Sequence, residues 1–128
     1  MNKRQIGAYY EGLACDYICE NGATIICRNF RSRSGEIDIV AKDGKYLSFI
    51  EVKYRTGSRY GEAEEAVDYR KQRIICRVSD FYMKRYGMST DTAVRYDVVA
   101  IMVDETSMIH IRWHKNAFAY IPSRQGLF

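Results

Sequence analysis

The sequence predicts a mixed α/β fold in which a central sheet is flanked by helices. Apolar residues recur at helical spacing over residues 4–20 and again over 62–86. Runs rich in β-branched and aromatic residues, typical of strands, occupy residues 23–30, 36–41, 46–54 and 93–103. The expected order is helix, three strands, helix and strand, an αβββαβ core, with one more strand near the end.

The first helix is expected to end at Asn21-Gly22, because both residues tolerate a left-handed backbone. The strand ATIICRNF follows, and RSRSG forms a polar turn. The next two strands, EIDIVA and YLSFIEVKY, are separated by KDGK. Asp-Gly between such runs is a strong hairpin signal, so these two strands should be antiparallel.

The second helix is expected to run from about Glu62 to Tyr86 and to stop at Gly87. It can cross over the sheet and lead to a parallel neighbour, which would make the sheet mixed. That neighbour is AVRYDVVAIMV, which is apolar enough to be buried on both faces. A turn over residues 104–107 then leads to the short strand MIHIRW.

Composition limits the class of protein. A chain of 128 residues with a net charge of +4 fits one globular domain. No apolar run approaches the roughly 20 residues of a membrane span, and the N-terminal MNKRQIGAYYEG lacks the apolar region of a signal peptide, so we expect a cytoplasmic location without membrane partners. None of the four cysteines forms a CxxC pair, so we expect small buried thiols rather than a zinc site.

Basic residues occur in groups along the chain. Such groups suit a polyanionic partner, but each could equally be a solvated surface. The groups are Arg28, Arg31 and Arg33; Lys53, Arg55 and Arg59; and Arg70, Lys71, Arg73 and Arg77.

The predicted hairpin places charged residues where a sheet interior is expected. Side chains alternate between the two faces of a strand, so Glu36 and Asp38 share one face, as do Glu51 and Lys53. These residues could lie on a solvated face, where acids and lysines pair across strands.

The turn decides whether the two charged pairs meet. If Asp43-Gly44 is a two-residue loop, Asp38 lies opposite Phe49, Glu36 lies opposite Glu51, and all the charged residues share a face. A loop of odd length would separate them. Like charges directly opposed in a ladder are destabilising, and a divalent cation removes that objection.

Mg²⁺ or Mn²⁺ is therefore the expected cofactor. Mg²⁺ prefers hard oxygen ligands, one or two carboxylates together with waters and phosphates. Asp38 and Glu51 are the expected ligands, with Glu36 binding directly or through water. Lys53 could hold a phosphate oxygen or orient an attacking water. These parts suit metal-assisted hydrolysis of a phosphodiester.

The segment GEIDIVAKDGKYLSFIEVKYR closely resembles the signature of the uncharacterised bacterial YraN-like family. That family belongs to the restriction-endonuclease-like, or PD-(D/E)XK, superfamily and is similar to archaeal-type Holliday junction resolvases. The resemblance covers most of the chain. It includes GAYYEGLACDYICENG, RKQRI, RYDVVAI and a closing NAF.

The resemblance implies a restriction-endonuclease-like αβββαβ core and a set of site residues. The superfamily pattern is an acid on the first helix, an Asp at the second strand and Glu-x-Lys on the third, which here matches Glu11, Asp38, Glu51 and Lys53. Glu11 would bind metal through water, although a helical glutamate is usually exposed. The proline that names the superfamily motif is replaced by Ile37.

Three further residues have open roles. Related nucleases often place a basic or amide side chain near the site on the second helix, where Lys71 and Gln72 occur here; both could equally lie on a solvated face. Asp97, inside an apolar strand, is expected to pair with a nearby arginine, to help position the site or to cap a loop.

The leading hypothesis is a Mg²⁺-dependent nuclease acting on DNA, with branched or repair intermediates as candidate substrates. Arg31, Arg33, Arg55 and Arg59 would bind backbone phosphates. A resolvase acts on two strands, so a homodimer is expected. The alternatives are a non-catalytic nucleic-acid-binding module and an accessory protein that retains the nuclease fold.

Overall fold

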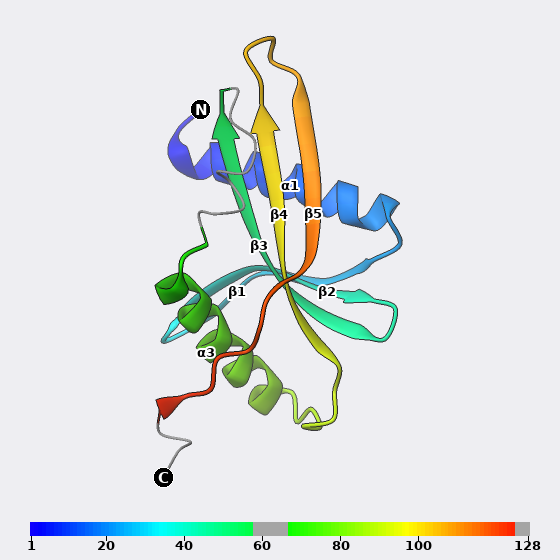
Figure 1. The fold of residues 1–128 in the computed structure, drawn as a ribbon, viewed down its shortest axis with the longest axis vertical. Helices are drawn as coiled ribbons and strands as arrows, with labels where there is room; N and C mark the ends of the chain where they lie inside the picture. The colour runs from blue at the N-terminus through cyan, green and yellow to red at the C-terminus, as the bar shows by residue number, and fades with distance from the viewer. Residues whose placement is uncertain (58–66, 125–128) are drawn as a thin grey trace.

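The computed structural model describes residues 1–57 and 67–124. Figure 1 shows their arrangement. Helix α1 (Lys3–Glu20) is followed by strands β1 (Thr24–Ser32), β2 (Gly35–Asp43) and β3 (Tyr46–Thr56). Helix α3 (Tyr69–Arg85) then leads to strands β4 (Val94–Val103) and β5 (Ile109–Phe118).

The strands form one sheet in the order β1-β2-β3-β4-β5. The β3–β4 pair is parallel and the other neighbouring pairs are antiparallel. A mixed sheet with helices on both sides confirms the predicted fold class, and α3 lies in the crossover between β3 and β4 as expected. Strand β4 is buried from Arg95 to Met102, which confirms that both of its faces are covered.

Two apolar clusters lie on opposite faces of the sheet. On one face, Ile18 of α1 packs with Ile50 of β3 and Val99 of β4. On the other face, Ile75 of α3 packs with Phe49 and Val98, the chain neighbours of Ile50 and Val99. Along β3 and β4, the side chains of one cluster alternate with those of the other, so the alternation of these two strands separates the clusters.

Capping residues determine where the helices begin. Asn2 caps α1 in a reciprocal capping box with Gln5, which satisfies free backbone amides of the first turn. The side chain of Asp68 accepts a hydrogen bond from the Lys71 amide and starts α3. The helix was predicted to begin at Glu62, but Val67 and Asp68 are not helical, so that prediction was wrong at these two residues. Residues 62–66 lie outside the described part of the chain.

The β2–β3 turn differs from the expected one. Asp43 pairs with Tyr46, so the loop consists of Gly44 and Lys45 rather than Asp43 and Gly44. Gly44 has a φ of +58°, and glycine at the first central position is the arrangement of a type II′ turn. The predicted pairing of Glu36 with Glu51 was therefore wrong by two residues, although the parity of the strands is unchanged.

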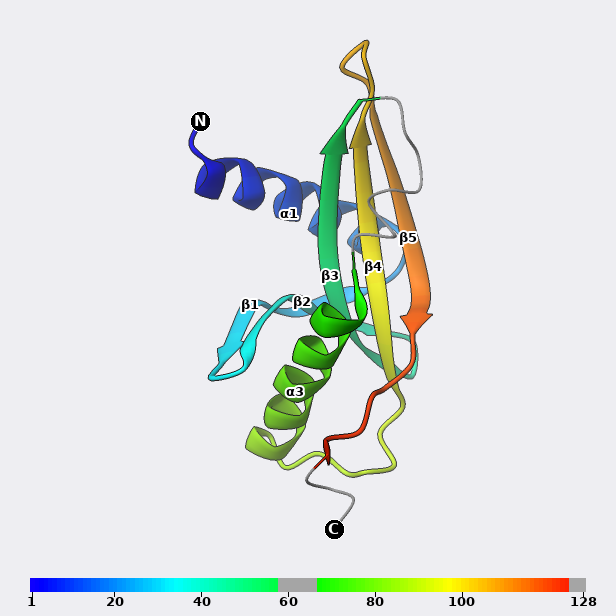
Figure 2. The same ribbon diagram turned by 60° about the vertical axis from the view of Figure 1, so that its left-hand side comes forward.

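The β2–β3 ladder ends early. Its last pair is Ile39 with Ile50, yet β2 begins at Gly35 and β3 continues to Thr56. Figure 2 shows the β1–β2 hairpin turning away from β3 at this point. The two strands therefore form a fork, and the charged half of the predicted hairpin lies at its opening.

Two other expectations were only partly correct. Strand β5 runs to Phe118, five residues beyond the predicted MIHIRW segment, with a register shift opposite Tyr96–Val98. Cys15 and Cys76 are buried as expected, whereas Cys19 is exposed. Within residues 1–57 and 67–124, no helix is both long and apolar enough to cross a membrane.

Candidate active site

Two carboxylates meet at the opening of the fork between β2 and β3. The Asp38 carboxylate accepts a hydrogen bond from the Val52 amide through Oδ2 at 2.8 Å. The side chain thus takes the place of the β2 backbone carbonyl that would accept this hydrogen bond if the β2–β3 pairing continued. Extending the observed register by one residue sets Asp38 opposite Glu51, so the two carboxyl groups are adjacent.

The pair is electrostatically unfavourable when both acids are ionised. Burial, together with the adjacent Glu51 carboxyl, raises the pKa of Asp38 from its ordinary value of 3.8 to about 8. Glu51 is only 5% exposed, and its Oε2 atom makes no hydrogen bond to any described residue. Without a cation, the pair therefore holds a proton up to roughly neutral pH.

Two lysines belong to the same region. Lys71 on the first turn of α3 places Nζ 3.3 Å from Glu51 Oε2. This contact is an ion pair without hydrogen-bond alignment, because the same Oε2 atom lacks a hydrogen-bond partner. Lys53 is half-buried two residues beyond Glu51, so strand alternation places it on the same face.

Glu11 and Glu36 lie beside this pair and are joined by a residue that we did not predict. Oriented to satisfy its neighbours, the Asn29 amide donates to Glu36 Oε1 at 2.7 Å and to Glu11 Oε1 at 3.0 Å. Burial first, and then the charge of Asp38, raises the pKa of Glu11. The three acids therefore share one electrostatic neighbourhood.

The signal for Asn29 in the sequence was indirect. Its φ is +54°, a left-handed conformation that asparagine tolerates better than most residues. The sequence indicated a role for Asn29 only in that a polar residue able to adopt this conformation lies inside a predicted strand.

A hollow of about 300 Å³ lies beside these acids. The residues that line it include Lys3, Arg4, Glu11, Asn29, Arg31 and Glu36. Its lining combines carboxylates with cations, and α1 supplies two of those cations. The sequence had given no reason to place Lys3 and Arg4 near the β2 acids.

The arginines predicted to bind phosphate differ in their acidic neighbours and in their exposure to solvent. Arg31 lies 3.1 Å from Glu36, so an acid already compensates part of its charge. Arg33 is exposed in the β1–β2 turn, and Arg55 is exposed near the end of β3. Arg59 lies outside the described residues.

Gln72 is engaged with the main chain. Its side-chain nitrogen donates to the Val67 carbonyl at 3.1 Å, which ties the first turn of α3 to the preceding segment. Lys71, its neighbour, is the residue of this pair that reaches the acids.

Asp97 has a separate environment. It is fully buried on β4 and accepts hydrogen bonds from Arg95, the Ser48 hydroxyl, Trp113 Nε1 and the Asn116 amide. The expected pairing with an arginine is confirmed. No contact joins Asp97 to the Asp38–Glu51 pair, so Asp97 belongs to a structural network.

The fork supplies two side chains, Asp38 and Glu51, whose oxygens suit a hard divalent cation. Asp38 and Glu51 offer oxygens that repel one another, and Glu51 Oε2 lacks a hydrogen bond. Among the residues that the structure describes, no three acids, histidines or cysteines are grouped closely enough to hold a metal by themselves.

The fold and this site define a class: a mixed α/β protein with an acidic pair and lysines where two strands of its sheet separate. The family model described as "Uncharacterised protein family UPF0102" matches residues 10–101. The chain belongs to that family.

Relatives extend over nearly the whole chain. A UPF0102 protein of Lachnoclostridium phytofermentans is 42% identical over 118 residues, covering 92% of this chain and 96% of the relative. One from Aliivibrio salmonicida is 43% identical over 117 residues, covering 91% and 93%. One from Caldicellulosiruptor bescii is 39% identical over 120 residues, covering 92% and 100%.

Proposed function

We propose that this protein is a metal-dependent nuclease that hydrolyses phosphodiester bonds in DNA, with branched or repair intermediates as substrates. The observation that carries the proposal is the adjacency of Asp38 and Glu51, which burial and mutual repulsion make unfavourable without a cation. Paired acids held in this way are typical of sites that perform chemistry.

The metal would be Mg²⁺ or Mn²⁺, bound by Asp38 and Glu51. Glu11, which is in electrostatic contact with Asp38, would act through a bound water. When bound, the ion supplies charge stabilisation at the phosphoryl group and lowers the pKa of a coordinated water. Glu51 Oε2, which is buried and lacks a hydrogen bond, is the feature of this chain that best fits such an ion.

The chain's own residues would orient the substrate and the water. Lys53, on the face of Glu51, would hold a phosphate oxygen or orient the attacking water. Lys71, whose Nζ lies 3.3 Å from Glu51 Oε2, would place a positive charge beside this acid. Arg31, Lys3 and Arg4, which line the same hollow, would hold the backbone beside the acids.

The resemblance to the PD-(D/E)XK superfamily supports the same proposal. Its order of acid on the first helix, aspartate on the second strand and Glu-x-Lys on the third corresponds to Glu11, Asp38, Glu51 and Lys53. These residues lie on α1, β2 and β3, the elements that the pattern requires.

Cleavage assays test the proposal on linear, flapped and four-way DNA with Mg²⁺ or Mn²⁺. We expect Asp38→Asn, Glu51→Gln and Lys53→Met each to reduce the rate by about 100-fold or more, as for loss of a charge-stabilising group. Glu105→Gln, which removes an exposed acid from the β4–β5 turn, is the matched control and should cleave normally.

A binding measurement tests the site without relying on cleavage. Because Asp38 holds a proton up to a pH of about 8, Mn²⁺ binding near neutral pH should release close to one proton per ion. Calorimetry in buffers of different ionisation enthalpy measures that release, and Asp38→Asn should abolish it. The nuclease proposal would be refuted if the wild-type protein neither cleaved any substrate nor bound Mn²⁺.

The absence of a third close ligand among the described residues favours a second candidate, a non-catalytic nucleic-acid-binding module. It would bind DNA with strong salt dependence, and Asp38→Asn would leave that binding unchanged while no substrate is cut. An accessory protein would neither bind nor cut DNA. We further propose a homodimer for action on two strands, which light scattering in solution would test.

A further inference from the structure

A second hollow lies between α3 and the C-terminal segment and is lined by arginines. Its volume is about 570 Å³, and its walls include Ser34, Arg70, Arg73, Arg77, Pro122 and Arg124. Arg70, Arg73 and Arg77 are three and four residues apart, so they share one face of α3. None of the metal or lysine positions of the candidate active site lines this hollow.

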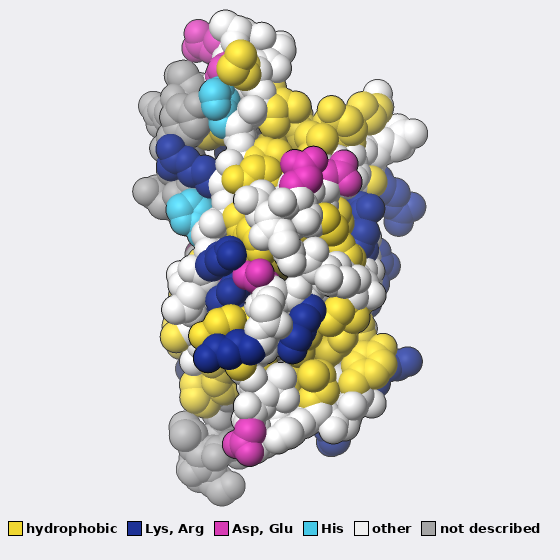
Figure 3. All heavy atoms as spheres, turned by 90° about the vertical axis from the view of Figure 1, so that its right-hand side faces the viewer, with side chains coloured by type: hydrophobic (Ala, Val, Ile, Leu, Met, Phe, Trp, Pro, Cys, Tyr) yellow, Lys and Arg dark blue, Asp and Glu magenta, His cyan; other side chains and the backbone are white. Residues whose placement is uncertain are grey.

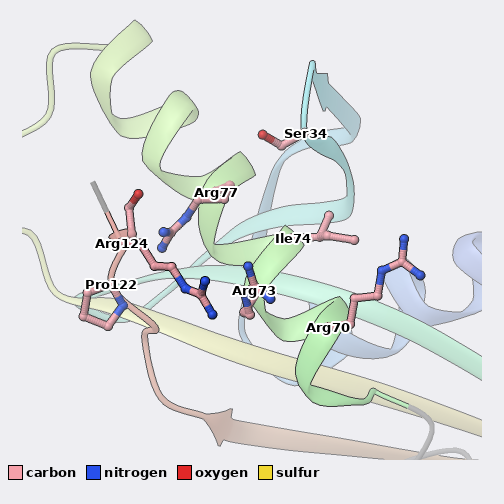
Figure 4. Close-up of a pocket in the computed structure, with 8 residues that line it drawn as sticks. Ser34, Arg70, Arg73, Ile74, Arg77, Pro122 and Arg124 are labelled. Atoms are coloured by element: carbon pink, nitrogen blue, oxygen red, sulfur yellow. The ribbon is translucent and has the colours of Figure 1, made fainter. Parts of the chain in front are cut away.

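Three of the four arginine side chains point into the same space. Figure 4 shows Arg73, Arg77 and Arg124 directed into the space between α3 and the C-terminal segment, whereas Arg70 points away from them. Among the described residues, no carboxylate lines the hollow, and none forms an ion pair with Arg73 or Arg124. Arg73 and Arg124, held near one another without such an acid, repel each other, and a bound anion removes that cost.

One of the arginines is held in place by the fold. Arg77 Nε lies 3.3 Å from Asp80 Oδ2, and its guanidinium donates to the Ile121 carbonyl and lies over the Tyr120 ring. The Ile121 amide also contacts the Cys76 sulfur at 3.4 Å. These contacts dock the C-terminal segment on α3 and bring Arg124 opposite Arg73, so the hollow is a constructed feature rather than a solvated helix face.

One face of the molecule provides a contrast. On the face shown in Figure 3, positive and negative side chains are interspersed. Charges that alternate in this way compensate one another, whereas the arginine hollow keeps a single sign.

The hollow is adjacent to the candidate active site along the chain. Ser34 on its rim is two residues from Glu36, and Arg70 directly precedes Lys71, which contacts Glu51. Gly35 permits this arrangement, because a Cβ there would lie 2.7 Å from Ile74 Cγ2 on α3. The β1–β2 turn can therefore lie directly on the helix.

We infer that this arginine hollow is a second binding site for the phosphate backbone of duplex DNA, separate from the site that would cut it. The inference rests on the proposed function only for the identity of the ligand. A guanidinium group donates two parallel hydrogen bonds to a phosphate, and Arg73 and Arg124 together suit consecutive phosphates better than a single small anion. The site would hold an arm of the substrate away from the acids.

The test measures binding of a fluorescent DNA duplex by anisotropy over a series of salt concentrations. All proteins carry Asp38→Asn and EDTA is present, so cleavage plays no part. We expect Arg73→Ala/Arg124→Ala to weaken binding by about 10-fold or more and to reduce the salt slope by about 2, one for each lost phosphate contact.

Two variants serve as controls. Lys42→Ala/Lys84→Ala removes the same charge from exposed positions outside the hollow and should change the affinity less than about 3-fold, as expected for non-contacting charges. Arg73→Lys/Arg124→Lys should keep most of the salt slope, because the charge remains. Thermal melting confirms that the variants are folded.

The outcomes separate this inference from the proposed function. Equal binding by the Arg73→Ala/Arg124→Ala and Lys42→Ala/Lys84→Ala variants overturns the arginine site, as does an absence of duplex binding by the parent protein. If the arginine variant loses binding while the protein without Asp38→Asn cuts no substrate, the arginine site stands and the nuclease is refuted.

Discussion

Asp97 and Asp38 lie on the two strands that flank β3, and their surroundings are opposite. Asp97 is completely buried and receives hydrogen bonds from a guanidinium, a hydroxyl, an indole and a backbone amide. Asp38 receives one backbone hydrogen bond and faces a second carboxyl group. A buried acid surrounded by donors contributes to the fold, whereas a partly buried acid opposed by another acid is arranged for a ligand.

The neighbours of the two acids extend the contrast. Arg95 bridges Asp97 and Asp43, and Lys115 also reaches Asp43 at 3.0 Å. The hydrogen bond from Arg95 holds the pKa of Asp43 below its ordinary value. At the fork, by comparison, Lys71 is the cation in contact with Glu51 among the described residues, and Oε2 remains without a hydrogen bond.

The largest expected effect is the loss of stability in Asp97→Asn. The substitution leaves the buried Arg95 without its main partner and turns an amide group toward other donors. We expect the free energy of unfolding to fall by about 3–5 kcal/mol, as for a broken buried ion pair. Urea denaturation at neutral pH measures it, and a loss below about 1 kcal/mol would remove the structural role of this network.

The same chemical change at the other acid should act in the opposite direction. In the unfolded chain Asp38 loses its proton near pH 4, whereas in the folded chain its pKa is about 8. The free energy of unfolding therefore falls as the pH rises through this window. Asp38→Asn removes that loss and keeps an acceptor for the Val52 amide.

We therefore expect Asp38→Asn to be more stable than wild type by about 1–3 kcal/mol at alkaline pH in EDTA, and equally stable below pH 4. Thermal melting across pH is the measurement. A variant less stable than wild type at high pH would mean that the Asp38–Glu51 pair is compensated, as the Asp97 network is. Excess Mn²⁺ should reverse the order by stabilising the wild type.

The smallest expected effect is that of Lys71→Met. Lys71 lies near the acids but is 36% exposed, so solvent screens its contribution. We expect a loss of at most about 1 kcal/mol at alkaline pH and a smaller loss near pH 4, where Asp38 is protonated and no longer attracts Lys71. Equal losses at both pH values would show that Lys71 acts through packing rather than charge.

Much of the fold followed from local patterns. The helical spacing before Asn21, the hairpin signal of Asp43-Gly44 and the apolar run around Val98 each predicted an element that the structure contains. The errors occurred where a single residue decides a boundary. Gly44 moved the turn by one position, and Asp68 capped α3 later than the apolar stripe suggested.

The candidate site was predictable only in part. Alternation along strands placed Glu51 with Lys53, and parity was sufficient to place Asp38 on the same side. Asn29, Lys3 and Arg4 were missed because they reach the acids through the packing of α1 and β1 against the fork. Arg124 likewise joins the α3 arginines only because Ile121 and Tyr120 dock on that helix.

The order of the elements, the mixed character of the sheet and the types of charged residue available follow from the amino-acid sequence alone. These depend on periodicity, turn chemistry and composition, which are local properties of the chain. The arrangement of the strands in space sets which acids oppose one another and which are neutralised. That outcome depends on where the β2–β3 ladder ends and on which donors other strands bring to each carboxylate, and neither is encoded in residue spacing alone.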